Sequence, residues 1–209
     1  MSKELVIVNT GCANISSVKY AFDRLGANVT VTDDHSLIKS ADKVLLPGVG
    51  SASAAMKSIK AKQLDIVIKE LTQPVLGICL GMQLLARQSN ETPGSHSGAT
   101  TDTVPCLDLI PTDIERMQVG NLVLPHMGWN QIQPDPESPL FDGIDNNSYF
   151  YFVHSFCAPE SDFTLATCNY GGMFSASIAK DNFYGVQFHP ERSGEAGAKL
   201  LNNFIEMSL

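Results

Sequence analysis

Short apolar runs alternate with stretches of helical periodicity over the first ninety residues, and this alternation limits the possible folds more than any other feature of the sequence. Four strands are predicted, at residues 5–8, 29–32, 44–46 and 74–78. Three helices are predicted, at residues 15–25, 52–61 and 80–88. Strands and helices that alternate along the chain are connected by right-handed crossovers, so we expect a mostly parallel sheet covered by helices on both faces.

The pattern changes in the second half of the chain. A polar stretch at residues 89–103 predicts a surface loop. Beyond it, short strands separated by turns are predicted at residues 149–153, 163–167, 174–179 and 183–188, which favours an antiparallel extension of the sheet. A final helix carries apolar side chains at Ala196, Leu200, Leu201, Phe204 and Ile205. We therefore expect one α/β domain over residues 1–209.

Composition is that of an ordinary globular protein and disfavours several functions. The 209 residues are 44% hydrophobic and 17% charged, which argues against disorder. A net charge of −8 disfavours nucleic acid or an anionic membrane surface as the main partner. No apolar run approaches the roughly 18 residues of a membrane span, and no signal peptide precedes the first strand. We therefore expect a cytoplasmic protein.

Five cysteines stand at positions 12, 79, 106, 157 and 168, with no Cys-x-x-Cys pair among them. The odd number and the spacing disfavour both a disulfide framework and a zinc cluster. No motif for a metal or an organic cofactor is visible. Free cysteine is among the most buried residue types, so we expect Cys12, Cys106, Cys157 and Cys168 to fill the core.

Cys79 differs because it lies in Gly77-Ile78-Cys79-Leu80-Gly81, between a predicted strand and a predicted helix. This is the Gly-x-nucleophile-x-Gly pattern of a nucleophile elbow. Two glycines leave room for a sharp turn that holds the nucleophile in a strained backbone conformation. The turn would place the sulfur at the carboxyl edge of the sheet and at a helix N-terminus, where backbone N–H groups favour a thiolate. The same pattern also fits a buried structural cysteine.

A nucleophilic cysteine needs a base, and His189 is well placed to be one. It ends a predicted strand, because Pro190 follows it. Glu191 faces the same way as His189 in an extended chain, so it could orient one ring nitrogen while the other meets the thiol. The Gly48-Val49-Gly50 turn after the third strand could supply a backbone N–H to a developing oxyanion, or could be a simple turn.

Two segments together resemble the class I, or triad, glutamine amidotransferases: Gly77-Ile78-Cys79-Leu80-Gly81-Met82-Gln83 and His189-Pro190-Glu191. Three more resemble the branch of that family formed by the glutaminase subunits of imidazole glycerol phosphate synthase. They are Pro47-Gly48-Val49-Gly50, Pro125-His126-Met127-Gly128-Trp129-Asn130 and Tyr149-Phe150-Tyr151-Phe152-Val153-His154-Ser155. The resemblance runs from about Val6 to the final helix. It implies a flavodoxin-like sheet in a single amidotransferase domain, and no cofactor.

The resemblance implies a role for each matching residue. Cys79 would attack the side-chain amide of L-glutamine and form a γ-glutamyl thioester. His189 would take the thiol proton and return it to the leaving ammonia, and Glu191 would orient His189. The backbone amides of Val49 and Leu80 would form the oxyanion hole. The positions that would hold glutamine are Gly50, Gln83, Glu91, Ser155 and Phe156.

The resemblance also implies a partner. Members of this branch form a heterodimer with a (β/α)₈-barrel cyclase and channel ammonia to a ribulosyl nucleotide in histidine biosynthesis. The matching interface and ammonia-gate positions are Asn14, His126, Trp129, Tyr151 and Arg192, and many relatives carry Lys at the last of them. The family keeps its glutaminase nearly silent until the partner binds its ligand. We hypothesise that the oxyanion hole around Val49 is misassembled in the isolated chain.

Three functions are open on the sequence alone. The first is the glutaminase subunit just described. The second is another enzyme on the same fold, either the glutaminase of a different amidotransferase or a γ-glutamyl peptidase. The third is a non-catalytic binding module on an inactive amidotransferase fold. Such modules usually lack one of the triad residues, and all three are present here.

Overall fold

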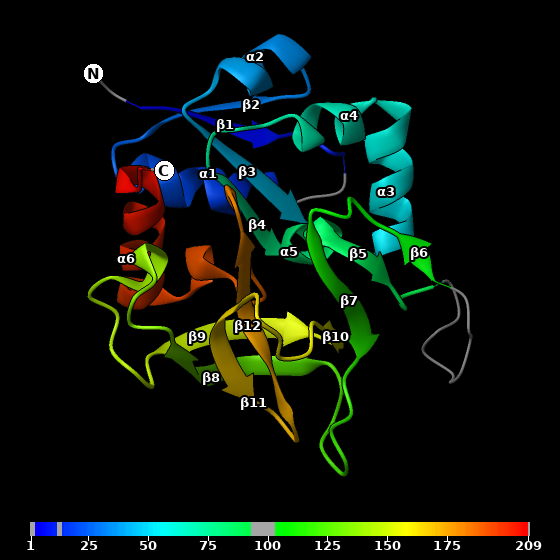
Figure 1. Cartoon of the computed structure of the whole chain (residues 1–209). Helices are drawn as coiled ribbons and strands as arrows, with labels where there is room; N and C mark the ends of the chain where they lie inside the picture. The colour runs from blue at the N-terminus through cyan, green and yellow to red at the C-terminus, as the bar shows by residue number, and fades with distance from the viewer. Residues whose placement is uncertain (1–2, 12–13, 93–102, 209) are drawn as a thin grey trace.

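The computed structural model describes residues 3–11, 14–92 and 103–208. Its centre is a nine-stranded sheet with the strand order β2-β1-β3-β4-β13-β12-β11-β8-β9 (Figure 1). The strands are β1 (Glu4–Val8), β2 (Asn28–Thr32), β3 (Lys43–Gly48), β4 (Val75–Cys79), β8 (His126–Pro134), β9 (Tyr149–His154), β11 (Thr164–Asn169), β12 (Met173–Lys180) and β13 (Phe183–Val186).

This sheet has a parallel part and an antiparallel part. The neighbours from β2 to β13 in the strand order pair in parallel. From β13 onward, every neighbouring pair is antiparallel. The order β2-β1-β3-β4-β13 is that of flavodoxin-like folds. The predicted α/β class with an antiparallel extension is therefore confirmed.

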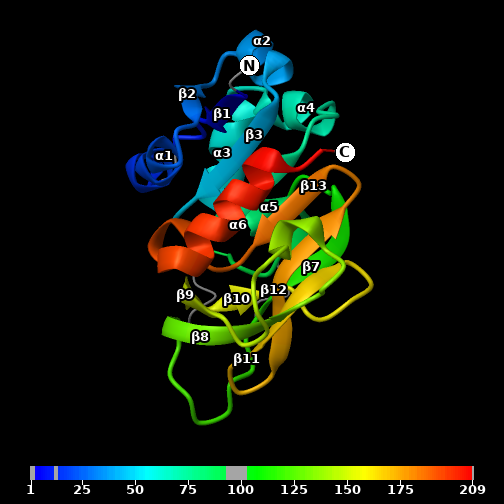
Figure 2. The same cartoon turned by 90° about the vertical axis from the view of Figure 1, so that its left-hand side faces the viewer.

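Helices cover both faces of the parallel part (Figure 2). Alternate residues of β1 face opposite sides, so Leu5 and Ile7 pack with α1 and α6, whereas Val6 and Val8 pack with α3, α4 and α5. Burial on both faces explains why the parallel strands are continuous apolar runs. The helices are α1 (Ile15–Arg24), α2 (His35–Ser40), α3 (Ala52–Ala61), α4 (Leu64–Lys69), α5 (Leu80–Leu85) and α6 (Gly194–Glu206), with 3₁₀ turns η2 (Pro139–Phe141) and η3 (Pro190–Arg192). Within the described ranges, none of the helices has the length and apolar character needed to cross a membrane.

A second, four-stranded sheet lies beside the main one, with the order β10-β7-β5-β6. Its strands are β5 (Ala86–Ser89), β6 (Val104–Pro105), β7 (Ile110–Arg116) and β10 (Phe156–Cys157). Ser155 is the single residue between β9 of the main sheet and β10 of the small one. The chain therefore passes from one sheet to the other at Ser155.

The differences from the predicted elements lie at element ends, in the small sheet, and in three further elements, α2, α4 and β8. The predicted helix 80–88 ends at Leu85, because the carbonyls of Leu84 and Leu85 accept hydrogen bonds from the Leu107 and Leu109 N–H groups instead of from the next helical turn. The chain then continues as β5. The predicted strand 183–188 ends at Val186. Helices α2 and α4 and strands β5 to β8 and β10 were not predicted. Most of the predicted loop 89–103, like Cys12, lies outside the described residues.

Candidate active site

The nucleophile elbow forms where β4 meets α5. Cys79 is the last residue of β4 and has φ 54° and ψ −112°, a conformation that residues with a Cβ rarely adopt. Close packing requires both glycines of the motif. A Cβ on Gly81 would collide with the backbone oxygen of Leu46, and a Cβ on Gly77 would lie 2.6 Å from the Gly81 oxygen. Because α5 has only six residues, any electrostatic help to the thiol comes from the N–H groups of its first turn.

His189 and Glu191 form a buried pair next to the elbow. His189 Nδ1 lies 2.9 Å from Glu191 Oε1, and both side chains are less than a tenth exposed. Nε2 is buried and makes no hydrogen bond of normal length with any described residue, which leaves it available to the Cys79 thiol. Burial lowers the pKa of His189, but its interactions with Cys79 and Glu191 outweigh burial and raise it to about 10. The site therefore favours a positive charge on His189.

One pocket of about 380 Å³ brings the predicted site residues together. Its walls include the three triad residues and both predicted oxyanion-hole residues. They also include all five residues predicted to hold glutamine, and Asn14 and Arg192 from the predicted interface. The members of these sets are Asn14, Val49, Gly50, Cys79, Leu80, Gln83, Glu91, Ser155, Phe156, His189, Glu191 and Arg192. The volume suits a ligand of amino-acid size.

Two of the residues predicted to hold glutamine already have partners inside the protein. Gln83 is 4% exposed, and its amide nitrogen lies 3.0 Å from the Phe156 carbonyl oxygen and 2.9 Å from Gln187 Oε1. Only the Gln83 amide oxygen is left for a ligand. Glu91 Oε2 accepts a hydrogen bond from the Ala52 N–H at 3.1 Å, so its carboxylate also caps α3.

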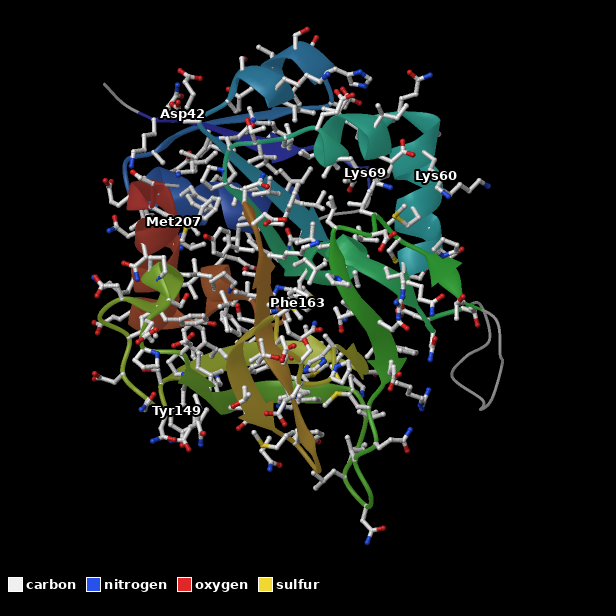
Figure 3. The ribbon with its side chains drawn as sticks, viewed as in Figure 1. Asp42, Lys60, Lys69, Tyr149, Phe163 and Met207 are labelled. Carbon is white, nitrogen blue, oxygen red and sulfur yellow. The ribbon has the colours of Figure 1, made fainter. Side chains whose placement is uncertain are left out.

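Three of the predicted interface residues lie on one exposed face. Met127 and Trp129 of β8, with Tyr149 and Tyr151 of β9, line the outer face of this strand pair, and Trp129 is opposite Tyr151 in the register. Their rings meet edge to face with centroids 6.2 Å apart. The Arg192 guanidinium lies over the Tyr151 ring, 4.2 Å from its centroid. Figure 3 labels Tyr149, which stands at the start of β9, the edge strand of the main sheet.

His126, predicted to lie at the interface, is in the interior and is 3% exposed. It is the first residue of β8, where successive side chains alternate between the two faces of the sheet. His126 and Trp129 are three residues apart and so point to opposite faces. The His126 ring lies against Tyr170 and Phe152, and its Nδ1 is 3.0 Å from His154 Nε2. Burial lowers the pKa of His126 to about 4 and that of His154 to about 3.

The other described cysteines differ from Cys79. Cys106, Cys157 and Cys168 are buried, as predicted, and burial raises the pKa of each thiol to about 12.

The part of the chain that the structure describes contains no group of three His, Cys, Asp or Glu side chains able to hold a metal ion. Gln187, whose amide nitrogen lies 3.8 Å from Cys79 Sγ, was not among the predicted site residues. The available signal was its spacing, because residues 187 and 189 face the same way in an extended chain.

Comparison with known proteins agrees with this geometry. Residues 6–207 match the family model described as Glutamine amidotransferase class-I. The imidazole glycerol phosphate synthase subunit HisH of Colwellia psychrerythraea is 55% identical over 211 residues, covering 99% of this chain and 94% of that protein. The subunit of the same name from Shewanella loihica is 57% identical over 205 residues, covering 98% and 91%. The PurLQS structure from Thermotoga maritima matches with a TM-score of 0.70, 16% identity and 99% coverage of both chains, which shows the fold alone.

Proposed function

Because this chain belongs to the class-I glutamine amidotransferases, and within them to the imidazole glycerol phosphate synthase subunits, we propose that it is the glutaminase subunit of such a synthase. It hydrolyses L-glutamine to glutamate and ammonia. The observation that carries the proposal is the single pocket in which Cys79, at the strained elbow, faces the buried His189–Glu191 pair. The proposed place of this reaction is the cytoplasm.

The first half of the reaction forms a thioester. His189 Nε2 takes the proton of the Cys79 thiol, and Glu191 stabilises the resulting positive charge through Nδ1. The thiolate adds to the side-chain carbonyl carbon of glutamine, and an electron pair moves onto the carbonyl oxygen. We assign the backbone N–H groups of Val49 and Leu80 to that oxyanion. In support, Gly48 is opposite Cys79 in the β3–β4 register, and the residues that follow the two strands, Val49 and Leu80, line the same pocket as the sulfur.

The second half releases the products. The carbon–nitrogen bond breaks, the proton held by His189 passes to the nitrogen, and ammonia leaves. A water molecule gives a proton to His189 Nε2 and adds to the thioester carbon. The carbon–sulfur bond then breaks, glutamate leaves, and His189 returns its proton to Cys79. The balance is one glutamine and one water consumed for one glutamate and one ammonia.

The outer face of β8 and β9 is the proposed docking site of a (β/α)₈-barrel cyclase subunit. In support of this, Trp129 is 55% exposed and Met127 is 62% exposed, and large apolar side chains that gather on one face are typical of protein interfaces. This face continues through Tyr151 and Arg192 to the mouth of the Cys79 pocket. Ammonia released at Cys79 would enter the barrel there and react with the ribulosyl nucleotide, giving imidazole glycerol phosphate and aminoimidazole carboxamide ribotide.

Glutamate release tests the proposal. It is measured for the chain alone, for the chain with the cyclase barrel, and for the pair with the ribulosyl nucleotide. We expect almost no glutamate release from the chain alone, and strong stimulation of glutamate release by the partner with its nucleotide bound. Cys79→Ala should abolish glutamine-dependent synthesis and leave ammonia-dependent synthesis intact, whereas Cys106→Ala, at a buried cysteine, should retain both. Full activity of the isolated chain would instead identify a free-standing glutaminase or a γ-glutamyl peptidase. Loss of the ammonia-dependent reaction in Cys79→Ala would refute the proposal that this chain hydrolyses glutamine and the barrel carries out the synthesis.

A further inference from the structure

Gln187 is a fully buried polar residue for which the mechanism above has no use. It follows β13 and comes two residues before His189. Its backbone N–H donates to the Ala176 carbonyl at 2.8 Å, which fixes the start of the side chain. Its amide nitrogen lies 3.8 Å from Cys79 Sγ, a hydrogen-bond distance for sulfur. The side chain therefore approaches the nucleophile from inside the protein.

The neighbours of Gln187 determine which end of its amide faces the sulfur. The Phe156 carbonyl can only accept, so the Gln83 amide must turn its nitrogen toward it, at 3.0 Å. That nitrogen also lies 2.9 Å from Gln187 and needs an acceptor there, which must be Gln187 Oε1. The remaining end of the Gln187 amide is its NH₂ group, and this group points at Cys79 Sγ.

A second donor holds the Phe156 carbonyl that anchors this arrangement. His154 Nδ1 lies 2.9 Å from the same oxygen. The carbonyl thus accepts from His154 and from Gln83, and its position is set from two sides. The chain of contacts that leads to Cys79 is consequently rigid, and the residues that form it, His154, Phe156, Gln83 and Gln187, are all buried. A rigid donor has a larger effect on a nearby anion than one that must reorient.

We propose that Gln187 is a positioning residue that donates a hydrogen bond to the Cys79 sulfur, holds it in the pocket and stabilises its thiolate form. The inference rests on the proposed role of Cys79 as nucleophile. A hydrogen bond to an ionised acceptor is roughly twice as strong as one between neutral groups, so an amide donor favours thiolate over thiol. Water cannot replace this donor, because Gln187 is not exposed to solvent.

The test measures the reactivity of the thiol, which requires neither glutamine nor a partner. The rate of Cys79 alkylation by iodoacetamide is followed against pH in the full chain, with the modified peptide identified by mass spectrometry. The titratable or charged groups around the thiol are His154, His189 and Glu191, with Glu91 and Arg192 further along the pocket wall. These groups are the same in every variant, and only Gln187→Glu adds a further carboxylate beside the sulfur, so differences between the profiles report on position 187.

Two substitutions distinguish the loss of the hydrogen-bond donor from a change in side-chain packing. Gln187→Met keeps the length of the side chain and removes both polar groups. Gln187→Glu keeps the acceptor for Gln83 and replaces the donor with an oxygen. Ser177→Ala is the matched control, because Ser177 Oγ donates to the Gly185 carbonyl at 2.8 Å and is buried on the neighbouring strand.

We expect Gln187→Met to slow alkylation at neutral pH by about tenfold and to move the midpoint of the pH–rate profile up by about one pH unit. Gln187→Glu should have a larger effect in the same direction, and Ser177→Ala should match the original chain. A folded Gln187→Met or Gln187→Glu variant with an unchanged profile would overturn the proposal. Should Gln187→Met not fold, Gln187→Leu, which also removes both polar groups and adds no charge, takes its place. Failure of the glutaminase assay with slowed alkylation would count against the proposed function and not against Gln187.

Discussion

Replacing Glu191 with Gln should lower the turnover of glutamine by about 10- to 100-fold and leave its KM within about twofold. Gln keeps the shape and the acceptor that faces His189 Nδ1 at 2.9 Å, and it removes the negative charge. A hydrogen bond to a charged group contributes about 1.5–3 kcal/mol, against about 0.5–1.5 kcal/mol for a neutral one. The difference of about 1–2 kcal/mol corresponds to about 5- to 30-fold in rate. Glu191 Oε2 is buried with no hydrogen-bond partner among the described residues, so an NH₂ group there adds an unpaired donor and extends the loss.

The same substitution changes how stability depends on pH. The pKa of His189 rises from 6.5 to about 10 in the folded chain, so the folded state binds this proton more tightly than the unfolded state. That stabilisation is complete below pH 6.5 and is lost as the pH rises from 6.5 through about 10. Without the Glu191 charge the pKa of His189 falls. The Glu191→Gln variant should therefore lose less stability over this pH range than the original chain does.

Two assays check these expectations. Glutamate release is measured with the liganded cyclase partner, and urea unfolding is followed at about pH 6 and about pH 9.5. Glu195→Gln is the control, because Glu195 is an exposed residue in the first turn of α6. An unchanged turnover in Glu191→Gln would refute the orienting role of Glu191. An identical pH dependence of stability in the two chains would refute the charge argument.

Three further substitutions test other parts of the site. His189→Ala should abolish glutamine-dependent synthesis as completely as loss of the nucleophile does and leave the ammonia-dependent reaction unchanged, measured as product formation from each nitrogen source. Gly81→Ala should destabilise the chain by more than about 3 kcal/mol in urea unfolding, because the new Cβ would collide with backbone, whereas Gly172→Ala places its Cβ 3.5 Å from the nearest atom and should cost far less. Trp129→Ala should weaken binding of the cyclase by about tenfold or more in calorimetry, whereas Leu37→Ala, at another exposed apolar residue, should not.

The pattern of neighbouring residues correctly predicted those helices and turns whose conformation depends mainly on residues close together in the chain. The helical spacing at residues 52–61 predicted α3 with the bounds that it has, and Ser51 accepts from the Ala54 N–H as its N-cap. The Gly-x-Cys-x-Gly pattern predicted the elbow, because the close approach of Gly77 to Gly81 lies within five consecutive residues, although Gly81 is also required by its contact with Leu46 of β3. His189 and Glu191 were predicted as a pair from the geometry of an extended chain, but the structure brings them together through the 3₁₀ turn η3, which begins directly after His189.

Contacts between segments far apart in the chain determine the remaining elements and side-chain positions. Residues 86–88 continue a helical pattern, but pairing with Ile110 and Asp113 of β7 makes them a strand. Nothing near His126 in the sequence shows that β9 will pair with its segment, so the alternation that separates His126 from Trp129 was hidden. Gln187 was missed because a donor to sulfur has no motif of its own. Its role depends on Gln83, which is 104 residues away in the chain.

Strand β9 connects the proposed docking face to the chemistry. On its outer side, Tyr151 lies beside Trp129 and under Arg192. Its backbone contacts both of the proposed catalytic residues, because the Tyr151 carbonyl accepts from the His189 N–H at 2.9 Å and the Val153 carbonyl lies 4.0 Å from Cys79 Sγ. β9 pairs with β8 along one edge and is the last strand of the sheet. On the proposed function, a partner that moved the outer side chains of β9 would also move the carbonyls beside His189 and Cys79, so we expect docking and glutamine hydrolysis to be coupled through this strand.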